Sequence, residues 1–212
     1  MFEEVCEDYM RWYFDEKIWK NVSYRGIRTL KNVSDMWNYQ EIFHAHNIGW
    51  VIETGSRHGG SGLFFADTLE AKNAEGKVIS IDIDSDSNYA PLHPRLEFLI
   101  GSSCSPEIVN EIKSRIPEHR MEKIFMILDS DHTKQHVLDE LNTLVPLLKS
   151  GDYLIVEDSC VNGHPIYPNF GEGPWEAIKE YIKQNPSELS ADKKRESKFG
   201  FTFAPDGFYI KL

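Results

Sequence analysis

The sequence predicts an α/β fold built as a three-layer sandwich, in which helices cover both faces of a mainly parallel sheet. Two observations predict this fold class. Short apolar runs of strand length alternate with amphipathic segments of helix length, and glycines or acids follow the ends of these runs. Five such runs and a β-hairpin near the C-terminus predict a seven-stranded sheet with an antiparallel C-terminal pair. A chain of 212 residues suits one main domain.

The N-terminal part is expected to be a helical extension, residues 1–30, to a domain that spans residues 31–212. Aromatic side chains recur there at helical spacing: Tyr9, Trp12, Tyr13 and Trp19. Such a helix packs on the domain, covers a ligand cleft or contacts another copy of the chain, because aromatics are favoured in interface cores. The last alternative leads us to expect a homo-oligomer.

The alternation of elements predicts their approximate bounds along the rest of the chain. The expected strands are 50–52, one within 76–84 after a turn, 96–100, 123–128 and 153–156, with Pro205-Asp206-Gly207 as the turn of the final hairpin. The expected helices are 34–46 with Ser34 as N-cap, 61–72, one after the Ser105-Pro106 cap, 135–149 with Pro146 as a candidate bend, and one from Pro174.

Composition and charge exclude several classes of function. Hydrophobic residues make up 41% of the chain, which indicates a globular fold rather than a disordered one. The net charge of −11 provides no basic surface for a phosphate backbone, so we expect no nucleic-acid partner.

Cysteine usage and the N-terminus indicate a cytoplasmic protein. Cys6, Cys104 and Cys160 are scattered and lack the spacing of a disulfide framework or a zinc site. Residues 1–20 carry several acids where a signal peptide needs an apolar core, and no apolar run is long enough to cross a membrane. We therefore expect a soluble protein without a membrane partner.

The segment "WVIETGSRHGGSGLFFADTL" (50–69) is the centre of the predicted site. An apolar strand ends on Glu53 and Gly55, and a helix begins near Ser61. Such a turn places backbone N–H groups and a helix N-terminus at the carboxyl edge of the sheet, where open α/β folds bind ligands. Asp82 follows Gly55 by 27 residues, at the end of the second strand. An acid there is placed to bind ribose hydroxyls, which indicates an adenosine-type ligand.

The glycine pattern distinguishes two nucleotide cofactors. A nicotinamide dinucleotide would need G-x-G-x-x-G, but Gly55 is followed by Ser56 and Arg57. The acid-x-Gly-x-x-x-Gly pattern from Glu53 to Gly59 instead resembles motif I of class I S-adenosylmethionine-dependent methyltransferases. This resemblance implies a Rossmann-like methyltransferase sandwich. It implies cofactor contacts from Glu53, Gly55, Ser61, Asp82, Ser102, Ser103 and Asp129. Serines at strand ends are otherwise helix caps, and that alternative remains for Ser102 and Ser103.

Four carboxylates follow the fourth and fifth strands: Asp129, Asp131, Glu157 and Asp158. If these strands are neighbours, their ends lie ~5 Å apart, and the charges would repel one another without a cation between them. Mg²⁺ prefers carboxylate, water and substrate oxygens. The sequence therefore predicts a magnesium or other divalent metal site, with an acidic rim that caps helices as the alternative.

The spacing of these acids resembles the metal-dependent O-methyltransferases of the catechol type. Glu157 follows Asp129 by 28 residues, with Asp158 adjacent. That family places a catalytic base, commonly Lys, three residues after the first acid, and this chain has His132 there. Histidine titrates near neutral pH and can accept a proton. Asp131 competes with Asp129 as the metal ligand, because Asp129 could instead orient the cofactor.

Several longer motifs resemble the cephalosporin hydroxylase family, which has the S-adenosylmethionine methyltransferase fold. They are "DMWNYQEIF" (35–43), "VIETGSRHGGS" (51–61), "GKVISIDID" (76–84), "GSS" (101–103), "LDSDHTKQHVLDEL" (128–141), "GDYLIVEDS" (151–159) and "GPWEAIKEYI" (173–182). The resemblance implies Mg²⁺-dependent methyl transfer from S-adenosylmethionine to a hydroxyl of a small molecule or sugar, with His132 and Asp129 as catalytic residues.

Two other functions stay open at this point. A hydroxylase, as the family name suggests, would want two histidines and a carboxylate around iron, and only His132 has a clear place near the acids. A non-catalytic, cofactor-binding subunit is the other alternative. The irregular stretch 159–173 is expected to be a lid that excludes water through His164, Tyr167 and Phe170.

Overall fold

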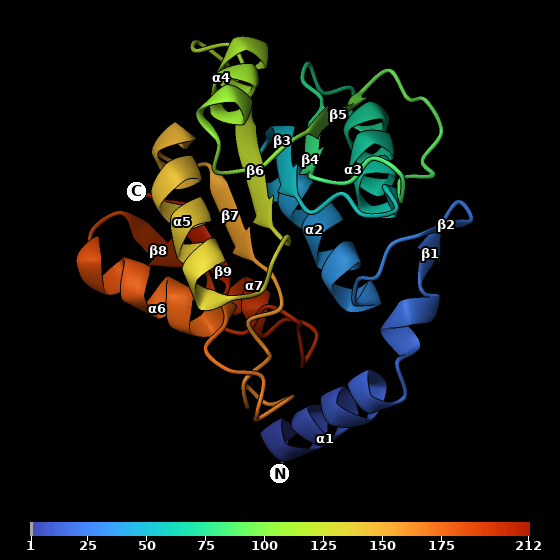
Figure 1. Cartoon of the computed structure of the whole chain (residues 1–212), viewed down its shortest axis with the longest axis vertical. Helices are drawn as coiled ribbons and strands as arrows, with labels where there is room; N and C mark the ends of the chain where they lie inside the picture. Colours follow the sequence, from blue (N-terminus) through green and yellow to red (C-terminus); the bar gives the residue numbers. More distant parts are fainter. Residues whose placement is uncertain (1) are drawn as a thin grey trace.

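A seven-stranded sheet forms the middle layer of the computed structural model, which describes residues 2–212 and leaves Met1 outside the description (Figure 1). The strands follow the order β5-β4-β3-β6-β7-β9-β8. Their bounds are β3 Ile48–Thr54, β4 Val78–Asp82, β5 Leu96–Ile100, β6 Lys123–Leu128, β7 Tyr153–Val156, β8 Leu189–Ala191 and β9 Phe208–Lys211. Strands β3 to β7 pair in parallel, and β9 is antiparallel to both of its neighbours. The predicted fold class is confirmed.

The strand order creates a switch point beside β3. The chain leaves β3 for β4 and β5 on one side, and then returns to β6 and β7 on the other side. Open α/β sheets bind ligands where the order reverses in this way. The turn after β3 thereby lies between the end of β4, with Asp82, and the end of β6, with Asp129.

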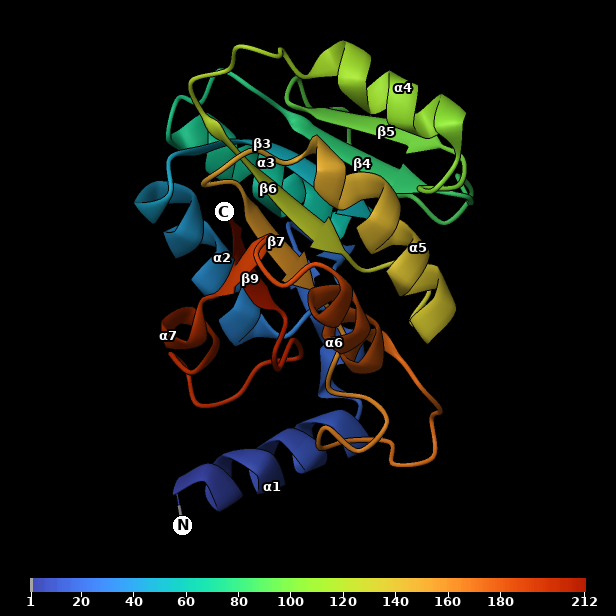
Figure 2. The ribbon, with the colours of Figure 1, turned by 90° about the vertical axis from the view of Figure 1, so that its left-hand side faces the viewer.

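Helices cover both faces of the sheet (Figure 2). On one face α2 (Val33–Ala45) and α3 (Gly60–Ala71) bury an aromatic cluster that includes Phe43, Phe65 and Phe125. On the other face lie α4 (Pro106–Arg115), α5 (Lys134–Leu144) and α6 (Pro174–Gln184) with an aliphatic cluster. Three further helices are short: η1 (Ile18–Asn21), η2 (Val145–Leu147) and α7 (Lys193–Glu196).

The N-terminal segment lies across the end of the sheet at which the ligand cleft is expected (Figures 1 and 2). It comprises α1 (Phe2–Asp15), η1 and a small hairpin, β1 (Ser23–Tyr24) and β2 (Ile27–Arg28). Side chains of α1 pack with the loop after β7 and with Phe203 in one buried cluster. The helix therefore packs on the domain. The boundary at residue 30 stays a prediction.

Three sequence predictions of local structure are wrong in detail. Helix α2 begins one residue earlier than expected, because Asn32 rather than Ser34 is its N-cap and accepts a hydrogen bond from the Ser34 N–H. Helix α5 ends at Leu144, and a 3₁₀ turn that contains Pro146 follows it. The C-terminal antiparallel pair consists of β8 and β9, and no hairpin forms around Pro205–Gly207 within the described residues. The segment before that turn instead packs its aromatic rings against α1.

The remaining helix predictions hold. Ser105 caps α4 by accepting a hydrogen bond from the Ile108 N–H at 3.3 Å, and α6 begins at Pro174. None of the helices within residues 2–212 combines the length and the apolar character that a membrane span requires.

Candidate functional site

A cavity of about 670 Å³ opens at the carboxyl edge of the sheet. This size is typical of sites for small molecules and cofactors. Its lining includes nine of the predicted site residues: Gly55, Ser61, Asp82, Ser102, Ser103, Asp129, Asp131, His132 and Asp158. The other two, Glu53 and Glu157, are buried and do not belong to the lining formed by the described residues.

The glycine turn after β3 is in direct contact with the end of β6. Gly55 has a positive φ of 84°, and a Cβ at this position would lie 1.9 Å from the carbonyl oxygen of Asp129. Only glycine fits such a close approach in a left-handed conformation. Because the two backbones touch, the predicted cofactor turn and the predicted catalytic loop form a single wall of the cavity.

Two serine hydroxyl groups connect the buried Glu53 carboxylate to this turn. The Ser80 hydroxyl donates to Glu53 Oε2 at 2.5 Å, and the hydroxyls of Ser80 and Ser56 lie 2.6 Å apart. Burial raises the pKa of Glu53 to about 7, although Lys31, Ser61 and Ser80 act to lower it. Ser56 lines the cavity, so Glu53 acts on the lining through Ser80 and Ser56.

The ends of β4 and β5 form the opposite part of the cavity. Asp82 accepts hydrogen bonds from the backbone N–H of Arg57 at 2.7 Å and of Asp84 at 3.0 Å, which fix its carboxylate at the strand end. The Ser103 hydroxyl donates to the buried carboxylate of Glu140 at 2.6 Å. The helix cap is Ser105, so Ser102 and Ser103 stay available as lining.

The two acidic strand ends lie side by side, as expected, because β6 and β7 are paired neighbours. Asp129, His132 and Asp158 bring one ligand atom each within 4.8 Å of one another. His132 Nε2 lies 3.1 Å from Asp158 Oδ2. Asp158 has a positive φ of 50°, a conformation that aspartate tolerates better than most residues and that is frequent at functional sites.

The other two predicted metal ligands have different surroundings. Glu157 is 3% exposed and accepts a hydrogen bond from the Tyr39 hydroxyl at 2.6 Å. Asp131 is exposed, and its Oδ1 accepts a hydrogen bond from the Thr133 N–H at 2.7 Å, just before α5. Asp129 is therefore the acid from the end of β6 that faces Asp158.

The sequence analysis did not identify a buried lysine, Lys31, that contacts these acids. Lys31 is 2% exposed, forms an ion pair with Asp129 Oδ2, and has its Nζ 3.4 Å from Glu157 Oε1. Burial alone would lower the pKa of Lys31, but Asp129, Glu157 and Glu53 together raise it above its usual value. Its position directly before the Asn32 cap of α2 follows no catalytic spacing, so no motif indicated it.

Burial and neighbouring charges together shift the pKa values of the carboxylates and of the histidine. Burial raises the pKa of Asp129 and of Asp158, while Lys31 and His132 oppose the shift. Burial alone would lower the pKa of His132, but Asp158 and Asp129 raise it above its ordinary value. The pair of carboxylates thus stabilises a proton on the imidazole.

Aromatic side chains form the remaining wall of the cavity. They come from α1, η1, the loop 159–173 and the C-terminal segment: Phe14, Trp19, Tyr167, Phe170 and Phe203. The rings of Phe14 and Tyr167 meet edge to face, with centroids 4.8 Å apart. The N-terminal segment therefore covers the cleft as well as packing on the domain.

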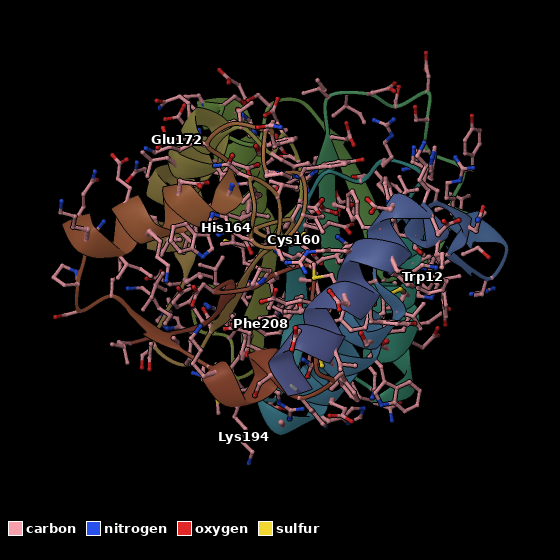
Figure 3. The ribbon with its side chains drawn as sticks, turned by 90° about the horizontal axis from the view of Figure 1, so that it is seen from below. Trp12, Cys160, His164, Glu172, Lys194 and Phe208 are labelled. Carbon is pink, nitrogen blue, oxygen red and sulfur yellow. The ribbon has the colours of Figure 1, made fainter. Side chains whose placement is uncertain are left out.

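Two of the three side chains expected in a lid contribute to this wall. Tyr167 and Phe170 line the cavity. The His164 ring instead stacks on Trp175, with ring centroids 4.1 Å apart, and its Nε2 lies 3.0 Å from Glu176 Oε1. Seen from below in Figure 3, α1 crosses this end of the molecule with Trp12 on it, and Cys160 and His164 lie in the neighbouring loop.

Comparison with known proteins identifies the relatives of this fold and site. The family model described as Rhamnosyl O-methyltransferase/CmcI matches residues 16–212. A protein named Rhamnosyl O-methyltransferase from Mycobacterium leprae (strain TN) is 46% identical over 210 residues, which are 99% of this chain and 91% of that protein. The chain belongs to the Rhamnosyl O-methyltransferase/CmcI family. The predicted family and the prediction of an O-methyltransferase are thereby confirmed.

Solved structures agree with this membership of the Rhamnosyl O-methyltransferase/CmcI family at the level of the fold. A structure of CmcI with Mg and SAM has a TM-score of 0.71 at 20% identity, covering 91% of this chain and 77% of that chain. A structure of MycE with Mg, SAH and mycinamycin VI has a TM-score of 0.52 at 18% identity, covering 72% of this chain and 44% of that one.

Proposed function

We propose that the protein transfers a methyl group from S-adenosylmethionine to a hydroxyl of a sugar unit, with the help of a divalent cation such as Mg²⁺. One observation carries this proposal. A single cavity joins Asp82 at one end to Asp129, His132 and Asp158 at the other, with the glycine turn after β3 between them. S-adenosylmethionine would supply an electrophilic methyl group in this cavity.

The cofactor fits the first end by the chemistry of its lining. Asp82 offers carboxylate oxygens to ribose hydroxyls at the end of β4, as acids in nucleotide-binding sheets do. Ser61, in the first turn of α3, would face the methionine carboxylate with its backbone N–H. Gly55 donates its own N–H to the Ile81 carbonyl at 2.8 Å, so it would contribute the close backbone approach of a residue without a side chain. Ser102 and Ser103 would bound the adenine side.

The second end offers a donor set that suits a hard cation. Carboxylate oxygens of Asp129 and Asp158 face one another beside His132, and Mg²⁺ prefers such oxygens. Tyr39 and Lys31 both contact Oε1 of Glu157, so its Oε2 is the oxygen that would bind the cation together with Asp129 and Asp158. When bound, a divalent cation supplies Lewis acidity toward the acceptor hydroxyl.

His132 would remove the proton of the acceptor hydroxyl. Its Nε2 lies beside Asp158 Oδ2, which stabilises the imidazolium that forms. Holding the acceptor oxygen in line with the methyl group supplies the proximity that such a displacement needs. Tyr167 and Phe170 would help to exclude water, since both side chains line the cavity.

A sugar acceptor is proposed from the relatives named Rhamnosyl O-methyltransferase, with 46% identity over 99% of the chain. A hydroxylase is not supported, because the group of Asp129 and Asp158 contains His132 as its one histidine among the described residues. The next histidine, His136, contacts the Ser130 hydroxyl at 2.9 Å instead.

The test is transfer of a labelled methyl group from S-adenosylmethionine to a panel of rhamnosides and other glycosides, with Mg²⁺ and with chelator. We expect transfer that needs Mg²⁺ and falls at low pH, where protonated His132 can no longer accept a proton. The H132N variant should lose most of its turnover, about 100-fold or more, and keep cofactor affinity. Cofactor binding without transfer to any acceptor would instead favour a non-catalytic subunit.

We also propose the cytoplasm as the site of action and a homo-oligomeric assembly. The cytoplasm is supported by Cys6, Cys104 and Cys160, which are free thiols. Self-association is supported by the outer face of α1, where Tyr9 is 47% and Trp12 is 50% exposed. Sedimentation of the wild type and of the W12E variant would test the assembly.

A further inference from the structure

Lys31 contacts two carboxylates that the proposed function assigns to the metal. Its ammonium forms an ion pair with Asp129 Oδ2 and lies 3.4 Å from Glu157 Oε1. Only 2% of the side chain is exposed, so the ammonium group has no path into solvent at this position. Lys31 is absent from the cavity lining, which means that it approaches the carboxylates from the protein side.

The start of α2 holds Lys31 in this place. Asn32, the helix cap, accepts from the Ser34 N–H and donates to Asp35 Oδ2 at 3.1 Å. Asp35 in turn accepts from the Phe203 N–H at 2.8 Å, which ties the helix start to the C-terminal segment. The two contacts of Asp35 are buried, so the helix start that directly follows Lys31 is held to the C-terminal segment.

The helix that follows Lys31 also contacts one of the partners of the lysine. Tyr39, two turns further along α2, donates its hydroxyl to Glu157 Oε1 at 2.6 Å. The same carboxylate oxygen therefore contacts a hydroxyl from α2 and the ammonium of the residue just before its N-cap. Such an arrangement holds Glu157 in one orientation and offsets part of its charge.

The charge of Lys31 has opposite effects on the stability of the fold and on the affinity for a divalent cation. Buried carboxylates without a partner are costly, so Lys31 stabilises the folded protein by pairing with Asp129 and Glu157. A divalent cation that binds the same carboxylates is repelled by the ammonium, and this repulsion is weakly screened in a buried site.

We propose that Lys31 is a built-in counter-cation of the metal site, which competes with the divalent cation for Asp129 and Glu157 and weakens its binding. The inference rests on the proposed function, because it assumes that these carboxylates hold the ion. Lys31 acts here as a positioning residue. It keeps the site folded without metal and makes occupancy depend on the available concentration of the ion.

Calorimetric titration of the full-length protein with Mn²⁺ and with Mg²⁺ tests this inference, after treatment with chelator and without cofactor. The K31M variant should bind either ion about tenfold more tightly than the wild type or better. Without metal it should unfold at a lower temperature, and each ion should raise its Tm more than that of the wild type. The K31Q variant, which keeps a hydrogen-bond donor without the charge, serves for the titration if K31M does not fold.

The matched control is K211M. Lys211 is 14% exposed and pairs with Glu188 at 3.0 Å. It lies beside the start of β7, whereas Glu157 and Asp158 follow the end of that strand, so its loss should leave metal affinity unchanged. Tighter binding by K31M or K31Q, together with no change in K211M, supports the inference. Equal or weaker binding by these two variants overturns it and leaves the metal site standing. No binding by the wild type and the variants overturns the metal site and the inference together.

Discussion

The hydroxyl of Tyr39 provides a measurable link between the core and the metal-site carboxylates. Tyr39 is fully buried, and burial followed by the charge of Glu157 raises its pKa well above its ordinary value, so the hydroxyl keeps its proton and donates. The Y39F variant removes that donor and retains the ring, which packs against Phe125 with centroids 5.4 Å apart. A buried hydrogen bond to a charged group contributes about 1.5–3 kcal/mol. We therefore expect the free energy of unfolding to fall by about 2 kcal/mol, and Tm by about 4–8 °C.

Urea unfolding at pH 7, followed by circular dichroism, measures this loss. The midpoint should move while the slope with denaturant stays unchanged, because the unfolded chain exposes the same surface. Y89F is the matched control, since Tyr89 is 65% exposed, and its change should stay within about 0.5 kcal/mol. A loss for Y39F no larger than that of the control would refute the role of this hydroxyl.

Two further predictions concern other parts of the molecule. Burial alone would raise the pKa of Asp206, but hydrogen bonds and attraction from Lys193 and Lys179 lower it to about 2. The lowered pKa stabilises the fold above about pH 4, and this contribution is lost as the pH falls toward about 2. The difference in unfolding free energy between wild type and D206N should therefore shrink over that range in urea titrations, and a constant difference would contradict this. In E140L the hydroxyls of Ser103 and Ser130 lose the buried carboxylate that they share. Binding of S-adenosylhomocysteine should weaken about tenfold by calorimetry, and unchanged affinity would exclude a positioning role for Glu140.

The fold could be predicted from the sequence because its strands are buried on both faces and therefore read as apolar runs. The run in β3 and the glycines after it follow directly from burial and from the tight turn at Gly55. The final antiparallel pair was harder, since β8 is only three residues long and lies within a polar stretch. Phe201 and Phe203 have the composition of a strand, but they pack against α1 instead.

The sequence predicts only those site residues that directly follow neighbouring strands. Asp129, His132 and Asp158 follow paired strands, so adjacent strand ends bring them together. Lys31 and Phe14 reach the site by tertiary packing from elements that precede the sheet, and no spacing in the sequence encodes that approach. Separating Asp129 from Asp131 also required the structure, because both follow β6 and only their side-chain contacts distinguish them.

The central claim is that the cofactor and a divalent cation share one cavity, with the cation between the ends of β6 and β7. A crystal structure of the full-length protein with S-adenosylhomocysteine and Mn²⁺, with anomalous difference maps, tests this claim most directly. We predict the cofactor product beside Gly55 and Asp82, and an Mn²⁺ peak within about 2.5 Å of carboxylate oxygens of Asp129 and Asp158. An Mn²⁺ peak instead at the other acidic group with a histidine, Asp67, Glu70 and His93, or a cofactor outside the cavity, would contradict it.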